Sequence, residues 1–177
     1  MMKKVVLVTG ASSGIGLSVA NYLHLQKKYI VYGTSRKINN SSNFSFNLIE
    51  LDVTEKSSIQ RCIAEILKKE SKIDILINNA GVGITGPLEE IPTSEINKHF
   101  KINVFGPILL IKEVLPSMKS SKNGVIINIT SVAGQIATPF RSIYSGGKAA
   151  LDIISETLAM EVRSLGIDVV SIAPGDF

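Results

Sequence analysis

Short apolar runs alternate along the chain with longer stretches in which apolar residues recur every three or four positions. The runs are rich in Val, Ile and Leu and are bounded by turn residues, which predicts strands at 5–8, 30–32, 47–51, 73–77, 125–129 and 168–172. The stretches between them predict helices near 15–27, 55–70, 94–119 and 143–165. In the second helix Ile59, Cys62 and Ile66 share one face, and Thr54 stands where an N-cap belongs.

This order of elements predicts the fold class. Strands that alternate with helices form βαβ units, whose right-handed crossovers build a sheet with helices on both faces. We therefore expect an α/β protein with a doubly wound, Rossmann-like parallel sheet of six strands. The sequence has no internal repeat and no linker, so residues 1–177 are predicted to form a single domain.

Composition and charge narrow the functional classes. The chain is 45% hydrophobic and 19% charged, and no apolar run approaches the roughly 18 residues that a membrane span requires. The formal charge is +4, but the basic residues are scattered, whereas a nucleic-acid binder concentrates them on one face. We expect neither a membrane span nor a nucleic-acid partner. The apolar start at 5–8 is too short for a signal peptide, and we expect a cytoplasmic protein.

Sulfur and imidazole side chains offer no metal site. Cys62 is the sole cysteine, which excludes an internal disulfide and a cysteine-based metal cluster, and its helical position indicates a buried structural thiol. His24 and His99 have no ligand partners at useful spacing and are interpreted as surface or packing residues. No metal is therefore predicted.

A glycine-rich turn follows the first strand and opens the first helix. Gly10 permits the tight turn, Gly14 allows the backbone to approach a pyrophosphate, and Gly16 allows close packing of the helix on the strand. The helix N-terminus offers free N–H donors and a positive dipole end to phosphate oxygens. The turn Thr9–Gly16 is thus predicted to bind a nucleotide, through Gly10, Ser12, Ser13, Gly14, Ile15 and Gly16.

A tyrosine and a lysine stand four residues apart at the start of the last predicted helix. At this spacing Tyr144 and Lys148 project from the same face. An unperturbed tyrosine is a poor base at neutral pH, but a nearby ammonium favours the phenolate. The pair is therefore suited to general acid–base catalysis.

Taken together, these motifs resemble the short-chain dehydrogenase/reductase family. The matching pieces occur in the family's order from end to end of the chain: Thr9–Gly16, Asp52-Val53, Asn78-Asn79-Ala80-Gly81, Asn103, Ser131, Tyr144…Lys148 and Pro174-Gly175. The segment Ser145-Gly146-Gly147 is a departure, because the family commonly has Ala-Ser before the lysine.

The resemblance implies an oxidoreductase that interconverts a carbonyl and a secondary or primary alcohol by hydride transfer. Tyr144 would be the general acid/base, Lys148 would also bind the nicotinamide ribose, Ser131 would hold the substrate oxygen, and Asn103 would anchor a proton-relaying water. Further cofactor contacts are implied for Asp52, Val53, Asn79, Ala80, Gly81, Pro174 and Gly175.

The residue after the second strand points to the form of the cofactor. NAD-binding Rossmann folds carry an acidic residue about 20 positions past the turn, where it binds the ribose 2′-hydroxyl. Here the strand ends without a carboxylate, and Arg36 provides a planar guanidinium suited to a 2′-phosphate. Ser13 could donate a further hydrogen bond. We expect NADP(H) in preference to NAD.

The resemblance also raises an alternative. Family members continue well beyond the Pro-Gly after the sixth strand, with a substrate lid, a helix and a final strand, whereas this sequence ends at Phe177. The chain is therefore expected to be C-terminally truncated, and either an active oxidoreductase or an inactive fragment or non-catalytic nucleotide-binding module. Apolar residues implied to line the substrate pocket favour a lipophilic small molecule: Val132, Ala133, Gly134, Ile136, Pro139 and Phe140. A homodimer is also expected, as in the family.

Overall fold

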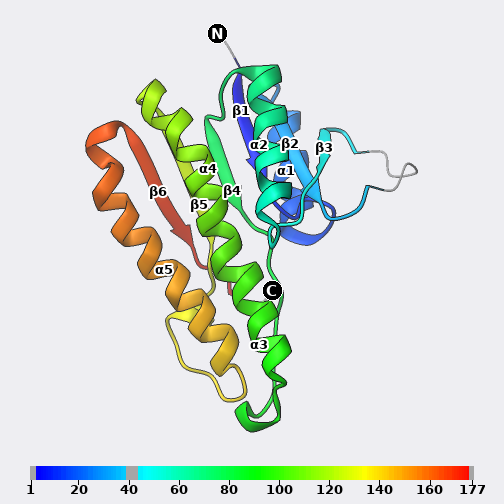
Figure 1. Cartoon of the computed structure of the whole chain (residues 1–177), viewed down its shortest axis with the longest axis vertical. Helices are drawn as coiled ribbons and strands as arrows, with labels where there is room; N and C mark the ends of the chain where they lie inside the picture. Colours follow the sequence, from blue (N-terminus) through cyan, green and yellow to red (C-terminus); the bar gives the residue numbers. More distant parts are fainter. Residues whose placement is uncertain (1–2, 39–43, 176–177) are drawn as a thin grey trace.

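The computed structural model describes residues 3–38 and 44–175, and Figure 1 traces the chain. Six parallel strands form one sheet in the order β3-β2-β1-β4-β5-β6. The strands are β1 (Lys4–Val8), β2 (Tyr29–Ser35), β3 (Asn47–Glu50), β4 (Ile75–Asn78), β5 (Gly124–Ile129) and β6 (Ile167–Ile172). This is the Rossmann strand order, and the predicted doubly wound parallel sheet is confirmed.

Helices cover the two faces of the sheet unequally. The helices α2 (Lys56–Glu70), α4 (Gly106–Ser121) and α5 (Ser142–Val162) lie in front of it in Figure 1, and α1 (Gly14–Leu25) lies behind. Successive residues of β1 supply the two cores: Val5 and Leu7 pack toward α2 and α4, while Val6 and Val8 pack toward α1. Because β1 is buried on both faces, it reads as a continuous apolar run.

The predicted helix at 55–70 forms, but its start differs from the prediction. Glu55 is the N-cap residue, and Thr54 instead donates its hydroxyl to Asp52 Oδ1 at 2.7 Å. The shift follows from the carboxylate, which also accepts the Thr54 backbone N–H at 2.9 Å and holds the chain in a turn before the helix begins. Cys62 is buried on the core face, as predicted, and burial raises its pKa to about 12.

The helix predicted over 94–119 is interrupted. It comprises α3 (Thr93–Phe100), a π-helical segment (Lys101–Phe105) and α4, which follow one another without a loop. Three consecutive residues of this segment are buried, namely Ile102, Asn103 and Val104. A π-helical turn carries one extra residue and is frequent at functional sites. Asn103 lies at its centre.

The last strand lies at the edge of the sheet. Val170 and Ile172 are 46% and 47% exposed, on the face opposite α5.

Within the described residues, no helix is long and apolar enough to cross a membrane.

Candidate functional site

The candidate site lies at the carboxyl ends of the strands, beginning with the glycine turn after β1. Gly10 has a φ of +65°, and a Cβ there would lie 2.9 Å from the Ala80 Cα atom. A Cβ on Gly16 would collide with the Gly10 carbonyl oxygen and the Asn79 amide. Both glycines are therefore required by backbone packing, so the turn can lie directly against the residues that follow β4.

Thr9 and Asn79 lock these two segments together. The Thr9 hydroxyl oxygen accepts hydrogen bonds from the backbone N–H groups of Asn79 (2.9 Å) and Ala80 (3.0 Å). The Asn79 side-chain amide donates to the carbonyl oxygens of Thr9 (2.9 Å) and Gly10 (3.2 Å). Asn79 thus braces the glycine turn, a role that its side chain fulfils without any ligand.

The N-terminus of α1 presents unused donors beside the turn. Ser13 is the N-cap residue, in extended conformation, and its side chain makes no capping hydrogen bond. The hydroxyl and the first N–H groups of the helix therefore remain available to an anion, and the helix dipole favours one there.

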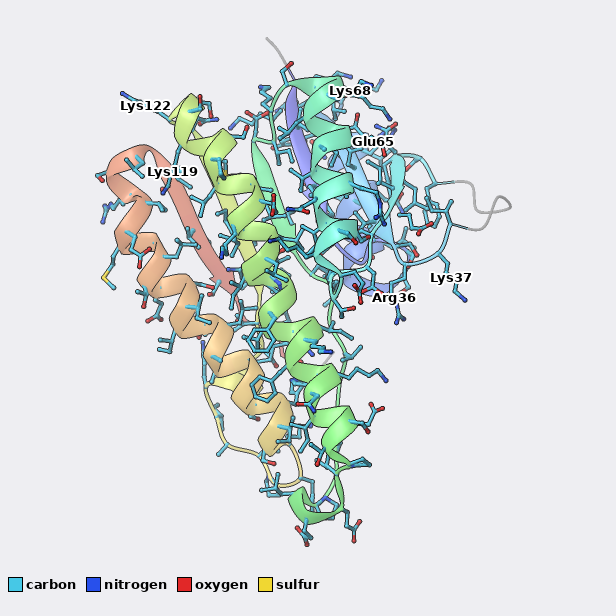
Figure 2. The ribbon with its side chains drawn as sticks, in the orientation of Figure 1. Arg36, Lys37, Glu65, Lys68, Lys119 and Lys122 are labelled. Atoms are coloured by element: carbon cyan, nitrogen blue, oxygen red, sulfur yellow. The ribbon has the colours of Figure 1, made fainter. Side chains whose placement is uncertain are left out.

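A groove of about 890 Å³ runs across the strand ends from this turn. Nine of the predicted cofactor residues line it, namely Gly10, Ser12, Ser13, Arg36, Asp52, Val53, Asn79, Ala80 and Gly81. Its volume is in the range of small-molecule and cofactor sites. Figure 2 shows Arg36 and Lys37 projecting together beyond the end of β2, where both also line the groove.

The remaining predicted cofactor residues lie outside this lining. Gly14, Ile15 and Gly16 form the first turn of α1. Pro174 lies past β6, where its carbonyl oxygen accepts a hydrogen bond from Val132 N–H at 3.1 Å, and Gly175 follows it.

Asp52, by contrast, lines the groove, and its Oδ1 atom accepts the hydrogen bonds from Thr54.

A second, smaller recess of about 310 Å³ contains the tyrosine and the lysine. Tyr144 and Lys148 line it from α5, and Asn103 lines it from the π-helical segment. Gly81 and Val82 line both this recess and the groove. The structure therefore brings three of the four predicted catalytic side chains together, next to the groove that the other motifs line.

Lys148 is buried, with 6% of its surface exposed, although it carries an amine. Its Nζ atom donates to the Ile129 carbonyl oxygen at 2.8 Å and lies 5.9 Å from the centre of the Tyr144 ring. Burial lowers the pKa of Lys148 to about 8. Because the desolvated ammonium lies beside the ring, it can favour negative charge on the phenol oxygen.

Asn103 is held in a fixed orientation by the backbone of Val82. Its Oδ1 atom accepts the Val82 N–H at 3.2 Å, and its Nδ2 atom donates to the Val82 carbonyl oxygen at 3.0 Å. The same Nδ2 atom contacts the carbonyl oxygen and the Nδ1 atom of His99, each at 3.1 Å. Asn103 therefore connects the helix to the loop that lines both cavities.

Ser131 is the predicted catalytic residue that does not line the recess. It follows β5 and caps a short 3₁₀ turn (Val132–Gly134), where its hydroxyl oxygen accepts the Ala133 N–H at 3.2 Å. Its position after β5 agrees with the prediction, but its hydroxyl is engaged within its own turn.

His99 is the residue of this region that the sequence did not indicate. The ring is 1% exposed and lies edge-on to Tyr144, with ring centroids 5.9 Å apart. A possible signal was its position four residues before Asn103 on a predicted helix, which places the two side chains on one face.

Proteins of similar sequence are oxidoreductases. A 3-ketodihydrosphingosine reductase of Bacteroides thetaiotaomicron is 39% identical over 177 residues, which cover all of this chain and 65% of the relative. Retinol dehydrogenase 8 of Homo sapiens is 33% identical over 97% of this chain and 58% of the relative. The chain thus spans less than two thirds of the length of these relatives.

Solved structures share the fold. A short-chain dehydrogenase from Streptomyces avermitilis matches with a TM-score of 0.93 and 37% identity, over 100% of this chain and 67% of that one. ElxO with NADP bound matches at 0.92, with 33% identity over 98% of this chain and 74% of that one. A 4-hydroxyisoleucine dehydrogenase complexed with NADH matches at 0.89, with 30% identity over 98% and 75%.

The model of the short chain dehydrogenase family matches residues 4–177, which include every strand, the groove and the recess described above. The chain is a member of the short-chain dehydrogenase family of oxidoreductases.

Proposed function

We propose that this protein acts as an NADP(H)-dependent oxidoreductase that interconverts a carbonyl and an alcohol, with Tyr144 as the general acid/base. One observation carries the proposal. Tyr144, Lys148 and Asn103 line a recess that shares Gly81 and Val82 with the groove of the glycine turn. A substrate in the recess would therefore lie next to a nucleotide in the groove.

The groove is suited to the cofactor. Its glycine turn lets a pyrophosphate approach the N-terminus of α1, and Ser13 offers a hydroxyl that the helix cap does not use. When bound, the cofactor supplies or accepts the hydride. Asp52, Val53, Asn79, Ala80 and Gly81 would contact the adenosine side, and Pro174 and Gly175 the nicotinamide side.

Each side chain of the recess then has a chemical task. Tyr144 would donate a proton to the carbonyl oxygen during reduction, or remove one from the hydroxyl during oxidation. Lys148 would favour the phenolate and bind the nicotinamide ribose, because its ammonium has two N–H donors besides the one on the Ile129 carbonyl oxygen. Asn103 would anchor a water that relays protons to Lys148. Ser131 would donate its O–H to the substrate oxygen, which it can do while its own oxygen accepts the Ala133 N–H.

Arg36 is the basis for preferring NADP(H). It lines the groove beyond the end of β2, beside Lys37 and on the same groove as Ser13. A guanidinium there suits a 2′-phosphate, and the segment carries no carboxylate that would bind a 2′-hydroxyl. The solved relatives include proteins bound to NADP and to NADH, so they do not distinguish the two cofactors, and the preference for NADP(H) rests on Arg36.

Exposed apolar side chains in the segment that leads from β5 to α5 favour a lipophilic substrate. Val132, Ile136 and Phe140 are 39%, 69% and 62% exposed in the segment between β5 and α5. The backbone of Phe140 reaches the loop that lines the recess, since its carbonyl oxygen accepts the Gly86 N–H at 2.9 Å. Two relatives act, by name, on 3-ketodihydrosphingosine and on retinol, both lipophilic molecules. A homodimer and a cytoplasmic location remain part of the proposal.

Cofactor titration tests the first half of the proposal. NADPH and NADH are titrated by fluorescence into the wild type, Arg36→Ala and Arg61→Ala, the last being an exposed arginine on α2. We expect Arg36→Ala to weaken NADPH binding by roughly tenfold or more, since a charge-assisted hydrogen bond contributes about 1.5–3 kcal/mol. NADH binding and the Arg61→Ala variant should be unaffected. A wild type that prefers NADH would refute the choice of NADP(H).

Turnover tests the second half. NADPH oxidation is followed with a panel of lipophilic ketones and aldehydes. Tyr144→Phe should bind NADPH normally but lose activity about 10²-fold or more, because it removes a general acid. A wild type that binds NADPH but turns over no substrate would instead support a non-catalytic nucleotide-binding module. Activity confined to highly charged sugars would count against a lipophilic substrate.

A further inference from the structure

The imidazole of His99 is a buried titratable group to which the mechanism above gives no task. His99 is the penultimate residue of α3, and its ring meets the Tyr144 ring edge-on at an interplanar angle of 64°. Its Nδ1 atom lies 3.1 Å from Asn103 Nδ2, and the Val82 backbone fixes that amide so that Nδ2 is a donor. One N–H of Nδ2 is donated to the Val82 carbonyl oxygen, and the other can be donated to the His99 carbonyl oxygen or to Nδ1. Nδ1 can accept it only when the ring is neutral and carries its proton on Nε2.

The Nε2 atom is buried and has no hydrogen-bond partner within the part of the chain that the structure describes. An unsatisfied buried donor costs about 1–3 kcal/mol. The same atom faces the backbone of α5 at Gly147, where a Cβ would lie 2.6 Å from Nε2 and 3.1 Å from Cδ2. A side chain at this position would force the ring to move, so the imidazole keeps this place because residue 147 is glycine.

The neighbouring glycine shows that this requirement is specific. A Cβ on Gly146 would meet nothing within 4 Å, although both glycines lie in α5. Each glycine costs the helix about 1 kcal/mol relative to alanine. At residue 147, where the family commonly has serine, the nearby His99 ring explains why glycine is present despite this cost. At residue 146 no contact explains the glycine.

The charge state of the ring matters because Lys148 is close. Burial, and next the positive charge of Lys148, lower the pKa of His99, against an opposite effect from the backbone of Val82. When the ring is neutral, Lys148 carries the positive charge of the recess alone. A neutral ring can also accept a hydrogen bond from the Asn103 amide, which a protonated ring cannot.

From this geometry we propose that His99 is a positioning residue, which as a neutral Nε2–H imidazole holds the Asn103 amide and the Tyr144 ring, and that Gly147 is the counterpart that admits it. The proposal rests on the function proposed above, because Tyr144 and Asn103 are the groups it positions. His99 itself lies outside the lining of the recess and would act through them.

The first arm of the test needs neither cofactor nor turnover. The chain has two histidines, so ¹⁵N-histidine spectra of the wild type and of His24→Gln assign the His99 ring. We expect an Nε2–H tautomer whose pKa lies below the ordinary value of a histidine, because the ring is buried. Gly147→Ala should shift the Asn103 side-chain amide and the Tyr144 ring resonances, whereas Gly146→Ala should leave both unchanged. An Nδ1–H tautomer, or equal shifts in the two variants, would overturn the proposal.

The second arm measures activity. Gly147→Ala should lower kcat roughly 10- to 100-fold, the effect of displacing reacting groups by about 1 Å, with NADPH affinity changed less than about threefold. His99→Gln, which can still accept from Asn103 but lacks the ring, should retain part of the activity and restore part of it in the double variant with Gly147→Ala. Gly146→Ala should match the wild type.

The two arms separate the failure of this inference from failure of the proposed function. If the wild type has no turnover, the proposed function fails and the spectra alone decide whether His99 and Gly147 position the two side chains. If Gly147→Ala does not fold, His99→Gln decides through kcat and the Asn103 amide resonances. Unchanged kcat and resonances in His99→Gln would overturn the proposal.

Discussion

Replacement of Lys148 by methionine tests the physical origin of its perturbed amine. The side chain is 6% exposed, and burial lowers its pKa from 10.5 to about 8. Methionine is unbranched and of similar length but has no charge to desolvate. We therefore expect Lys148→Met to abolish turnover and yet to increase the free energy of unfolding at neutral pH.

The magnitude follows from the pKa. A shift from 10.5 to about 8 corresponds to about 3 kcal/mol, at about 1.36 kcal/mol per pKa unit. The variant also loses the hydrogen bond to the Ile129 carbonyl oxygen, worth about 1 kcal/mol. The net gain at pH 7 should be about 2 kcal/mol.

The pH dependence is the sharper test. Below pH 8 the amine is protonated in both the folded and the unfolded protein, so the whole desolvation cost is present. Between pH 8 and 10.5 the folded protein loses the proton while the unfolded chain retains it, so the stability of the wild type rises with pH. The advantage of the variant should therefore shrink by about 3 kcal/mol between pH 7 and 10.5.

Urea unfolding of the wild type, Lys148→Met and Lys112→Met at several pH values measures this difference. Lys112 is an exposed lysine on α4, so its replacement should give a difference that does not vary with pH. Burial also raises the pKa values of Cys62 and Tyr32 to about 12, but these groups are present in all three proteins and cancel in the comparison. A stability difference between the wild type and Lys148→Met that is constant with pH would refute the reasoning.

Three further outcomes are expected. Gly16→Ala should abolish NADPH binding in fluorescence titrations and lower the Tm, because a Cβ there collides with the Asn79 amide and the backbone of the turn. Cys62 should react with a thiol reagent only as fast as the protein unfolds, since the thiol is buried and its pKa is raised to about 12; rapid labelling of the native chain would contradict this. Asp74→Ala should destabilise the fold by about 2–4 kcal/mol in urea unfolding, because the buried carboxylate accepts the Val5 N–H at 2.7 Å.

The sequence allowed the fold to be predicted in some detail because its signals are local. Strands buried on both faces appear as short apolar runs, and the face of α2 appears as a 3.6-residue period at Ile59, Cys62 and Ile66. The π-helical segment could not be found in this way. Ile102 and Val104 are apolar and buried, so the stretch still reads as part of one long helix, and no glycine or proline within Lys101–Phe105 marks where the hydrogen bonds shift.

The parts of the candidate site also differed in whether a local stretch of sequence could indicate them. The glycine turn and the Tyr144/Lys148 spacing are properties of contiguous segments, so the sequence could indicate them. Ser131 was assigned by resemblance, yet its hydroxyl is held by the Ala133 N–H, and a sequence motif carries no information on such an engagement.

The contact between His99 and Gly147 depends on two helices that meet only in the folded chain. Taken alone, His99 is an ordinary histidine in a helix, and Gly147 is a departure from the family's pattern that costs helix stability. The structure shows that one explains the other, because the volume that a side chain at residue 147 would occupy holds the imidazole. A compensating pair of this kind predicts coupling: the effects of His99→Gln and Gly147→Ala on kcat should be non-additive, whereas His99→Gln and Gly146→Ala should combine additively.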